Sequence, residues 1–382
     1  MSETRVKKIG FFTEGPPFDG DTPDQRALGG SETALVQAAR ALAERGHQVT
    51  VFNNCARPGL FDGVTYLHRR EFVKRFMADV FDVFIVSRFF GFFSVPIRAG
   101  LKILWNHDTL DRPAALRPLL DRIDIFFTLS GFHRDNFLTR IPSLTDRIFV
   151  TRNGIDPALI DQSIEGVSKD PDKIIYASRP ERGLKILLKD IWPELIRARP
   201  GLTLYLCGYE VGQRDLAPGL AELYKSIDEL VNESKNVVSL GPLAKQDYYR
   251  RLAGSALMLY PCVFPEISCI VALEAQACLT PILTTDGFAL SETVGTPEFR
   301  VPGRPGTESY NQEFIKRALG LLQAPGKAAT LAGEAGLAVR GHYNWPLIAA
   351  EWDRLFDLAL ASRRSAAAQR LNQGTRPHEQ MV

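Results

Sequence analysis

Two glutamates lie close together in a part of the chain that is otherwise almost entirely apolar. Glu266 and Glu274 are eight positions apart, and the residues between them are mostly Ile, Val, Ala, Leu and Cys. Burying an unpaired carboxylate is costly, so a buried carboxylate needs hydrogen-bonding or ionic partners. Such groups gather at functional sites. We therefore interpret the two glutamates as parts of one binding or catalytic site.

The local sequence predicts how these two side chains are placed. It predicts a short buried strand at 256–260 and, after the break at Pro265, a buried helix at 267–277. Glu266 would lie at the start of this helix and Glu274 about two turns inside it, with both side chains leaning towards the helix mouth. The alternative is two solvated acids. It is reasonable for Glu266, because acids favour the first turn of a helix, and weaker for Glu274.

Two arginines could supply positive charge to the same site. Arg179 and Arg182 are three positions apart and directly follow a predicted strand at 173–177. Two guanidinium groups can bind a diphosphate through paired hydrogen bonds. Taken alone, they are equally well explained as solvated surface charges. Their position at the carboxyl end of a strand favours a site, because open α/β sheets bind ligands there.

A histidine and a glycine pair stand at corresponding places in the first half of the chain. His107 directly follows a predicted strand at 102–106. Gly29 and Gly30 precede a predicted helix with Ser31 as its N-cap, an arrangement that can bind an anion. The alternatives are a surface histidine and a tight turn with a cap, and the sequence leaves both open. The dinucleotide fingerprint G-x-G-x-x-G is absent here.

The elements that must position these residues alternate between strand and helix, which predicts an α/β fold with two doubly wound units. A chain of 382 residues is long for one domain, and the polar stretch 160–173 marks the boundary. Residues 342–360 form an amphipathic helix that must pack on something. Strands are expected at 6–13, 48–53, 82–86, 102–106, 123–128 and 147–150, and then at 173–177, 202–208, 237–241, 256–260 and 281–285.

Composition narrows the class of protein. Apolar residues make up 45% and charged residues 24% of the chain, as in ordinary globular proteins. The net charge of +2 gives no electrostatic reason to expect nucleic acid as a partner. The five cysteines show no CxxC spacing and look like reduced core thiols. There is neither a signal-peptide core nor an apolar run of about 18 residues, so we expect a cytoplasmic protein.

Taken together, these motifs resemble the retaining family-4 glycosyltransferases, which have the GT-B architecture of two facing Rossmann-like domains. The similarity extends over roughly residues 6 to 360. One motif alone would be weak, but six in the right order are specific. They are GGSE (29–32), WNHD (105–108), NGID (153–156), RPERG (179–183), FPE-x7-EA (264–275) and LSETV (290–294).

The resemblance implies a division of labour between the domains. Residues 1–160 would form the acceptor-side domain, with a helix at 342–361 crossing back to pack on it. Residues 161–341 would form the donor domain, which binds the nucleotide sugar, and 362–382 would be a disordered tail. The implied donor-binding residues are Gly29, Gly30, Ser31, Glu266, Ile267, Ser268, Cys269, Ile270 and Glu274, and the implied catalytic residues are His107, Arg179, Arg182 and Glu266.

The same resemblance implies roles for these side chains. Glu274 would hold the donor ribose, Glu266 would hold hydroxyls of the donor sugar, and His107 would touch that sugar near the acceptor. Arg179 and Arg182 would clamp the diphosphate and stabilise it as the leaving group. The sugar would be transferred with retention by a front-face displacement. The scheme of two carboxylates flanking the bond fits less well, because Glu274 is too deep in its helix.

We predict neither a cofactor nor a catalytic metal, because the guanidinium groups would supply the positive charge. The two Asp-x-Asp sequences, at 19–21 and 170–172, lie in polar segments that look like loops. Arg182 replaces the lysine usual in the family, Cys269 and Cys278 replace common glycines, and 286–290 replaces a glycine-rich turn. These differences leave the donor base and the donor sugar open.

The sequence also leaves the acceptor unidentified. The implied partners are a nucleotide sugar and a carbohydrate or lipid-linked acceptor. The aromatic run 89–93 is best interpreted as core, with a peripheral contact to the cytoplasmic membrane face as the alternative. Acceptor identity, linkage and oligomeric state cannot be read from the sequence. Two other functions remain as alternatives, a GT-B sugar-nucleotide epimerase and a non-catalytic module that binds nucleotide sugars.

Overall fold

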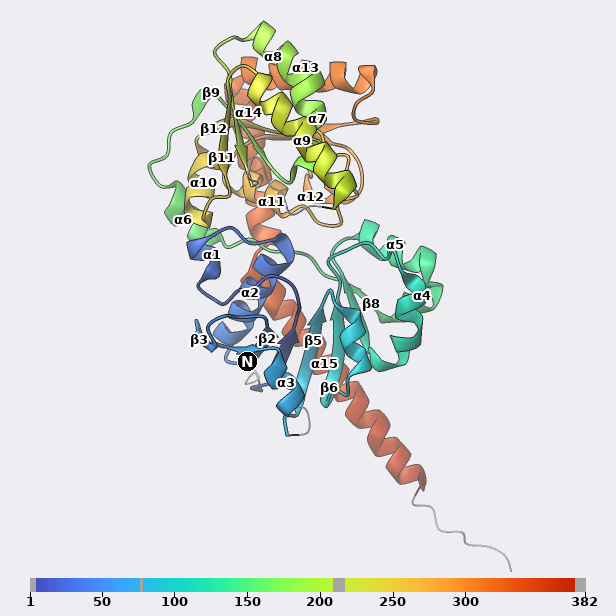
Figure 1. The fold of residues 1–382 in the computed structure, drawn as a ribbon. Helices are drawn as coiled ribbons and strands as arrows, with labels where there is room; N and C mark the ends of the chain where they lie inside the picture. Colours follow the sequence, from blue (N-terminus) through green and yellow to red (C-terminus); the bar gives the residue numbers. More distant parts are fainter. Residues whose placement is uncertain (1–4, 76–77, 209–216, 375–382) are drawn as a thin grey trace, which may run out of the picture.

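The computed structural model of this chain describes residues 5–75, 78–208 and 217–374. Two α/β units lie one above the other, each built on its own sheet (Figure 1). We call the unit that contains the first sheet the first domain and the other the second domain. Helices cover both faces of each sheet, as expected for doubly wound folds.

The first sheet has eight strands in the order β3-β4-β2-β1-β5-β6-β7-β8. All neighbours are parallel except β3 and β4. Its central strands are buried on both faces, which explains why residues 83–86 are apolar without interruption. The strands are β1 (Lys8–Phe12), β2 (Gln48–Asn53), β3 (Gly59–Phe61), β4 (Val64–His68), β5 (Phe81–Ser87), β6 (Ala99–Trp105), β7 (Ile125–Thr128) and β8 (Ile148–Val150).

The second sheet has six parallel strands in the order β11-β10-β9-β12-β13-β14. Strands β9 and β12 lie side by side at its centre, so the loops that follow them are neighbours. The strands are β9 (Asp170–Ala177), β10 (Thr203–Cys207), β11 (Val237–Gly241), β12 (Ser255–Tyr260), β13 (Ile282–Thr285) and β14 (Arg300–Val301).

The helices bury their apolar faces against these sheets. Those of the first domain are α1 (Thr22–Gln25), α2 (Gly30–Glu44), α3 (Arg70–Arg75), α4 (Pro113–Leu116) and α5 (Gly131–Arg140), followed by α6 (Pro157–Ile164) on the way to the second sheet. The rest are α7 (Leu184–Ile186), α8 (Trp192–Ala198), α9 (Pro218–Glu233), α10 (Lys245–Ala253), α11 (Ile270–Ala277), α12 (Leu290–Thr293), α13 (Glu308–Gln323), α14 (Pro325–His342) and α15 (Trp345–Gly374).

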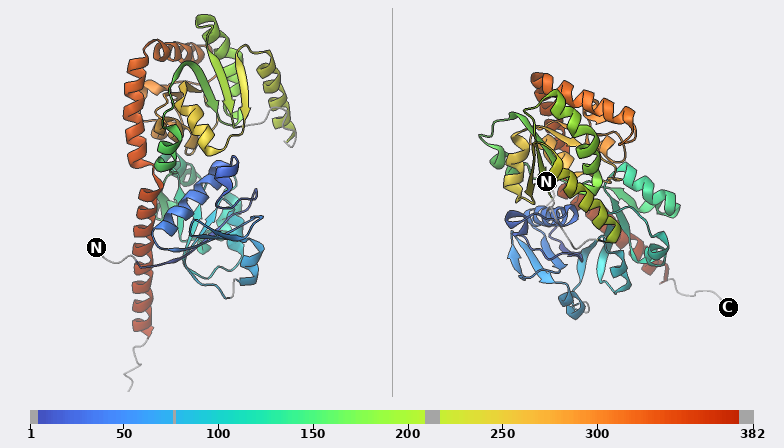
Figure 2. Two further views of the ribbon diagram at one scale, coloured as in Figure 1. Left: turned by 90° about the vertical axis from the view of Figure 1, so that its left-hand side faces the viewer. Right: turned by 45° about the horizontal axis from the view of Figure 1, so that its top comes forward.

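The last helix crosses back from the second domain to the first. In Figure 2 (left), α14 lies along the upper domain and α15 continues down the lower one. Trp345, Trp352 and Phe356 of α15 are buried in the core of the first domain. The Trp352 indole donates to the hydroxyl of Thr151 (2.7 Å). This is the crossing helix that the sequence predicts.

The aromatic run at 89–93 contributes to the core of the first domain. Phe93 is 1% exposed, and the Phe92 ring stacks on Phe12 and meets the edge of Phe72. Aromatic side chains packed in this way stabilise a core through both area and ring geometry. In the part of the chain that the structure describes, no helix is long and apolar enough to cross a membrane.

Several expected elements differ from the observed ones. Helix α11 begins at Ile270 rather than at 267, and the N-cap of α2 is Gly29 rather than Ser31. The β3–β4 pair, β14 and the helices between 290 and 342 were not predicted. Asp170 and Asp172 lie in β9, so the expectation of a loop there was wrong. Helix α15 runs on to Gly374, through much of the expected disordered tail, and residues 375–382 lie outside the described residues.

Candidate functional site

Loops at the carboxyl ends of the two sheets meet between the domains. The hydroxyl of Ser130, just after β7, donates to the carbonyl of Ile267, which lies in the segment between β12 and α11 (2.7 Å). Gly30, at the mouth of α2, faces Ile270 so closely that an added Cβ would be 3.4 Å from its Cδ1. Ser130 and Gly30 therefore bring the first domain against the residues that connect Glu266 to α11.

Glu266 lies in this segment, four positions before α11, and its side chain is almost completely buried. Its Oε1 atom accepts hydrogen bonds from Nη1 of Arg182 (2.8 Å) and from the hydroxyl of Tyr260 (2.6 Å). The Arg182 guanidinium also lies over the Phe264 ring, 4.2 Å from its centre, a favourable cation–π distance. The carboxylate is thus held by a cation and a neutral hydroxyl.

The electrostatics of this cluster keep both partners in their donor forms. Burial is the largest single influence on Arg182 and opposes its charge, but the attraction and hydrogen bond of Glu266 together with Tyr260 and Cys269 outweigh it and raise the pKa of the guanidinium above its usual value. Burial, reinforced by Glu266, raises the pKa of Tyr260 well above its usual value. Arg182 is therefore charged and Tyr260 protonated at neutral pH, and both donate to Glu266.

Glu274 lies about one turn inside α11, not the two turns expected, because the helix starts later. Its Oε1 atom accepts hydrogen bonds from Nζ of Lys245 and from the hydroxyl of Tyr249 (3.0 Å). Its Oε2 atom is buried and has no hydrogen-bond partner among the residues that the structure describes. A carboxylate oxygen in this state is an unused acceptor in a buried site.

The arginine loop after β9 is fixed against the loop after β12. The Val263 amide donates to the carbonyl of Arg182 (3.2 Å). Gly183 has φ +135°, and an added Cβ would lie 2.1 Å from the carbonyl oxygen of Pro261. A side chain at this position is excluded both by the backbone conformation and by the close approach. Arg179 is exposed, and its side chain has no hydrogen bond or ion pair among the described residues.

His107 follows β6 in the first domain, and its ring packs on Trp105 (4.4 Å between ring centres). Burial, with smaller contributions from Arg88 and His133, lowers the pKa of His107 well below its usual value. Its Nε2 atom is buried and has no hydrogen-bond partner in the described part of the chain. The imidazole is therefore neutral at pH 7, with one nitrogen unused.

Arg88 links the expected anion site to the histidine loop. It donates to both carboxylate oxygens of Asp108 (2.8 and 3.0 Å) and to the hydroxyl of Ser31 (3.2 Å). Its φ of +66° is unusual for a residue other than glycine. Ser31 thus binds a side chain instead of capping α2, and the expectation for its role was wrong.

The segment 267–270 leads from Glu266 into α11. The Cys269 carbonyl accepts the first amides of the helix, from Ala272 (3.1 Å) and Leu273 (3.2 Å). The Ser268 hydroxyl is buried and without a partner among the described residues. All five cysteines are buried and unpaired thiols. Burial raises the pKa of Cys269 well above its usual value, so this thiol is not a nucleophile at neutral pH.

The structure brings Glu266, Arg182 and Tyr260 together, and separately groups Glu274 with Lys245 and Tyr249. Arg179 is exposed and forms no ion pair with either carboxylate. The tyrosines, Lys245 and Arg88 were not predicted. Arg88 could have been found, because it follows a strand end just as His107 does. Lys245 and Tyr249, which are four residues apart and share a face of α10, gave a weaker signal.

The aspartate pairs considered as metal ligands are bound to basic side chains instead. Asp19 accepts from Arg57 (3.0 Å), and Asp172 accepts from Arg199 (2.8 Å). Among the described residues there is no group of three or more His, Cys, Asp or Glu side chains that could hold a metal ion.

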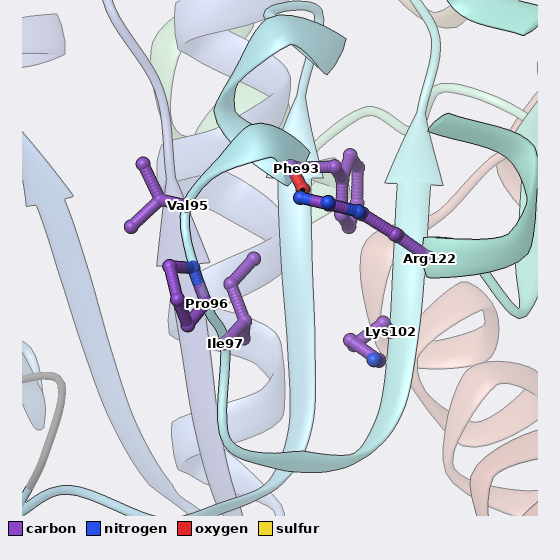
Figure 3. Close-up of a pocket in the computed structure, with 6 residues that line it drawn as sticks. All are labelled: Phe93, Val95, Pro96, Ile97, Lys102 and Arg122. Carbon is purple, nitrogen blue, oxygen red and sulfur yellow. Dashed lines mark hydrogen bonds between the residues drawn. The ribbon is translucent and has the colours of Figure 1, made fainter. Parts of the chain in front are cut away.

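A cavity of about 290 Å³ in the first domain is separate from the groups described above. Figure 3 shows that it lies beside the chain that connects Phe93 to β6, with Lys102 and Arg122 at its edge. None of the expected donor-binding or catalytic residues lines it. The lining residues are Phe93, Val95, Pro96, Ile97, Lys102 and Arg122.

Comparison with known proteins supports the fold and the resemblance. Residues 171–323 match the family described as glycosyl transferases group 1. The structure is similar to sucrose-phosphate synthase from Thermosynechococcus elongatus, with a TM-score of 0.71 and 16% identity over 94% of this chain and 100% of that one. A search of curated protein sequences finds no match.

Two further similar structures contain nucleotides. Anabaena Alr3699/HepE in complex with UDP and glucose has a TM-score of 0.68 and 18% identity, over 92% of this chain and 99% of that one. The catalytic domain of starch synthase IV from Arabidopsis thaliana, bound to ADP and acarbose, has a TM-score of 0.68 and 11% identity, over 94% of this chain and 100% of that one. The predicted GT-B architecture is confirmed. The retaining family-4 subtype stays a prediction.

Proposed function

We propose that this protein is a retaining glycosyltransferase, which moves a sugar from a nucleoside-diphosphate donor to a hydroxyl of a carbohydrate or lipid-linked acceptor. The observation that carries the proposal is the buried Glu274, with one oxygen held by Lys245 and Tyr249 and the other unused. It lies in the domain whose residues 171–323 match group 1 glycosyltransferases. Structures similar to this one contain UDP or ADP, which supports a nucleotide in the equivalent place.

The donor ribose fits the unused oxygen of Glu274. A ribose hydroxyl that donates to Oε2 satisfies a buried acceptor, and hydrogen bonds to charged groups contribute about 1.5–3 kcal/mol. Lys245 and Tyr249 keep the carboxylate in one orientation. Because α11 is buried in the core of the second domain, this anchor is rigid.

The donor diphosphate fits the arginine loop and the mouth of α2. Arg182 uses Nη1 for Glu266, which leaves its other N–H groups for a phosphate oxygen. Arg179 is exposed and has no partner among the described residues, so it can turn towards the same anion. The first amides of α2, after Gly29, add the favourable end of a helix dipole.

The proposed reaction uses these groups, with the retention that the family resemblance implies. The bond between the anomeric carbon and the diphosphate oxygen breaks, and a new bond to the acceptor oxygen forms on the same face. The acceptor proton passes to a phosphate oxygen of the leaving group. Glu266 accepts hydrogen bonds from sugar hydroxyls, and Arg182 stabilises the charge that develops on the diphosphate. Neutral His107 offers its free nitrogen to the sugar or the acceptor.

We propose that no metal takes part, because the two guanidinium groups can neutralise the leaving diphosphate. Addition of EDTA should then leave turnover unchanged, and a loss of turnover that Mg²⁺ or Mn²⁺ restores would overturn this part of the proposal.

The proposal is tested with the purified full-length protein. Thermal shifts with UDP, GDP and ADP identify the base, and release of the nucleoside diphosphate from the corresponding sugar conjugates, with and without sugar acceptors, measures transfer. Nuclear magnetic resonance of the product reports the anomeric configuration. A donor that is epimerised rather than transferred would contradict the proposal. So would a protein that no nucleotide stabilises and that Glu274→Ala leaves unchanged.

A further inference from the structure

The N-terminus of α5, in the first domain, is joined to the second domain by several polar contacts. Its cap, Ser130, and its first two residues, Gly131 and Phe132, all contact residues after β12 or β13. Two of these contacts are made by the backbone amides of the helix itself. The partners in the second domain are Ile267, Phe288 and Glu292.

The Ser130 hydroxyl has two separate roles. Its oxygen accepts a hydrogen bond from the His133 amide (3.1 Å), which caps α5. Its proton is donated to the Ile267 carbonyl across the domain boundary (2.7 Å), and the hydroxyl is buried. Ile267 directly follows Glu266, so this bond fixes the backbone beside the carboxylate that we assign to the donor sugar.

Glu292 supplies a second cap to α5 from the other domain. Its two oxygens accept from the amides of Gly131 (2.8 Å) and Phe132 (2.9 Å). These amides have no partner within a helix, and the helix dipole favours a negative charge at this end. The rings of Phe132 and Phe288 pack beside this contact, 5.6 Å apart.

His133 extends the connection to the loop of His107. Its Nε2 donates to the carbonyl of Asp108 (2.9 Å), while its Nδ1 accepts from the Leu129 amide (3.2 Å). This pattern requires a neutral ring. Burial lowers the pKa of His133 to about 4, so the ring is neutral at pH 7. The start of α5 therefore ties the loop after His107 to the segment of Glu266.

We propose that Ser130 and Glu292 are positioning residues that latch the two domains and set the distance between His107 and Glu266. The latch rests on the proposed function, because it matters for turnover only if sugar transfer occurs between these groups. It makes a prediction that a general role in stability does not. The groups that we assign to the ribose, and the arginines that we assign to the diphosphate, lie in the second domain, and only the mouth of α2 reaches the diphosphate from the first. Loss of the latch should therefore reduce kcat much more than the affinity for the nucleoside diphosphate.

Two substitutions at Ser130 separate the latch from the helix cap. Ser130→Asp keeps a good N-cap acceptor but has no proton to donate to the Ile267 carbonyl. We expect its kcat to fall about 100-fold, as small misplacements of reacting groups do, while the affinity for the nucleoside diphosphate falls much less. Ser130→Thr keeps both roles and should restore kcat to within a few-fold of the wild type.

Glu292→Ala tests the other half of the latch, with Glu298→Gln as the matched control. Glu298 lies six positions later and is also exposed, and its side chain has no hydrogen bond or ion pair among the described residues. In Glu292→Ala, hydrogen exchange of the Gly131 and Phe132 amides should become at least about tenfold faster, and kcat should fall. The control should change neither.

These readouts distinguish failure of the latch from failure of the proposed function. Unchanged amide exchange in Glu292→Ala would overturn the latch whether or not the protein transfers sugar. So would equal losses of kcat and nucleotide affinity in Ser130→Asp, or a folded Ser130→Thr that stays as inactive as Ser130→Asp. If the wild type transfers no sugar, the proposed function fails, and faster exchange in Glu292→Ala still supports the domain contact.

Discussion

Glu266 and Glu274 have nearly the same surroundings but differ in the burial of the free carboxylate oxygen and in the cation that holds the other one. Both are buried, with 4% and 2% exposure. Each accepts one hydrogen bond from a cation and one from a tyrosine hydroxyl. The partners are Arg182 and Tyr260 for Glu266, and Lys245 and Tyr249 for Glu274.

The difference lies in the second carboxylate oxygen and in the cation. Neither glutamate has a hydrogen bond to Oε2 from the described residues, but only the Oε2 atom of Glu274 is completely buried. The cation of Glu274, Lys245, lies at the start of α10. The cation of Glu266, Arg182, belongs to the loop that we assign to the diphosphate. In the proposed function, Glu274 therefore binds a ligand in the ground state, whereas Glu266 connects the sugar to the leaving group. Burial alone does not tell a binding carboxylate from one that acts in the reaction.

The largest effect is expected at Glu266. Glu266→Gln keeps the size of the side chain but removes its negative charge. That charge orients Arg182 and, in the proposed function, strengthens the hydrogen bonds that the carboxylate accepts from sugar hydroxyls. We expect kcat to fall about 100- to 1,000-fold, with little change in affinity for the nucleoside diphosphate. Steady-state kinetics and calorimetry measure the two quantities. An equal loss in both would remove the distinction between the two glutamates.

A smaller effect is expected at Glu274, on the affinity for the nucleoside diphosphate instead of on kcat. Glu274→Gln should raise the Kd of the nucleoside diphosphate about 10- to 100-fold, because a hydrogen bond to a charged acceptor contributes about 1.5–3 kcal/mol. At saturating donor, kcat should change only a few-fold. Calorimetric titration checks the first effect. A normal Kd in this variant would show that the ribose lies elsewhere.

Lys245 should stabilise the fold through its ion pair with Glu274, not through a contact of its own with the donor. Lys245→Met leaves a buried carboxylate with one neutral partner, and we expect the free energy of unfolding to fall by about 3 kcal/mol. Tyr249→Phe removes a neutral donor from the same oxygen and should cost about 1 kcal/mol. Urea unfolding at pH 7 measures both. If Lys245→Met is as stable as the wild type, the ion pair is not formed in solution.

Acid should destabilise the domain contact beside Glu266 through His133, whose amide bonds to Ser130, which in turn bonds to the carbonyl of Ile267. The folded pKa of His133, about 4, is below the ordinary value of 6.5, so the unfolded chain binds the proton first as the pH falls. Its contribution to stability is complete above pH 6.5 and is lost between pH 6.5 and 4. From pH 8 to pH 5 this amounts to about 2 kcal/mol. Unfolding of His133→Gln should show a shallower pH dependence.

The fold could be predicted because each buried parallel strand is a short apolar run with a turn at its end. The start of α11 could not. The sequence favours a helix from 267, but the backbone groups of Glu266 and Ile267 bond to Ala289 and Ser130 instead. Such contacts between distant segments override local preference.

The candidate site was predicted only in part, for a similar reason. The glutamates and Arg182 stand out as charges in apolar surroundings or at a strand end. Their partners do not, because Lys245 and Tyr249 precede Glu274 by 29 and 25 positions and meet it only in the folded chain. Ser31 was given the wrong role because its hydroxyl bonds to Arg88, which is 57 positions away.

The most direct test compares the binding of the nucleoside diphosphate and its sugar conjugate to the wild type, Glu266→Gln and Glu274→Gln, with the base that thermal shifts select. For each protein, calorimetry gives the ratio of the two Kd values, which measures how much affinity the sugar adds to the nucleoside diphosphate. We expect Glu266→Gln to bind the diphosphate normally and to lose the gain from the sugar, and Glu274→Gln to bind both ligands more weakly and to keep that gain. The opposite pattern, or the same change in both variants, would contradict the roles assigned to the two glutamates.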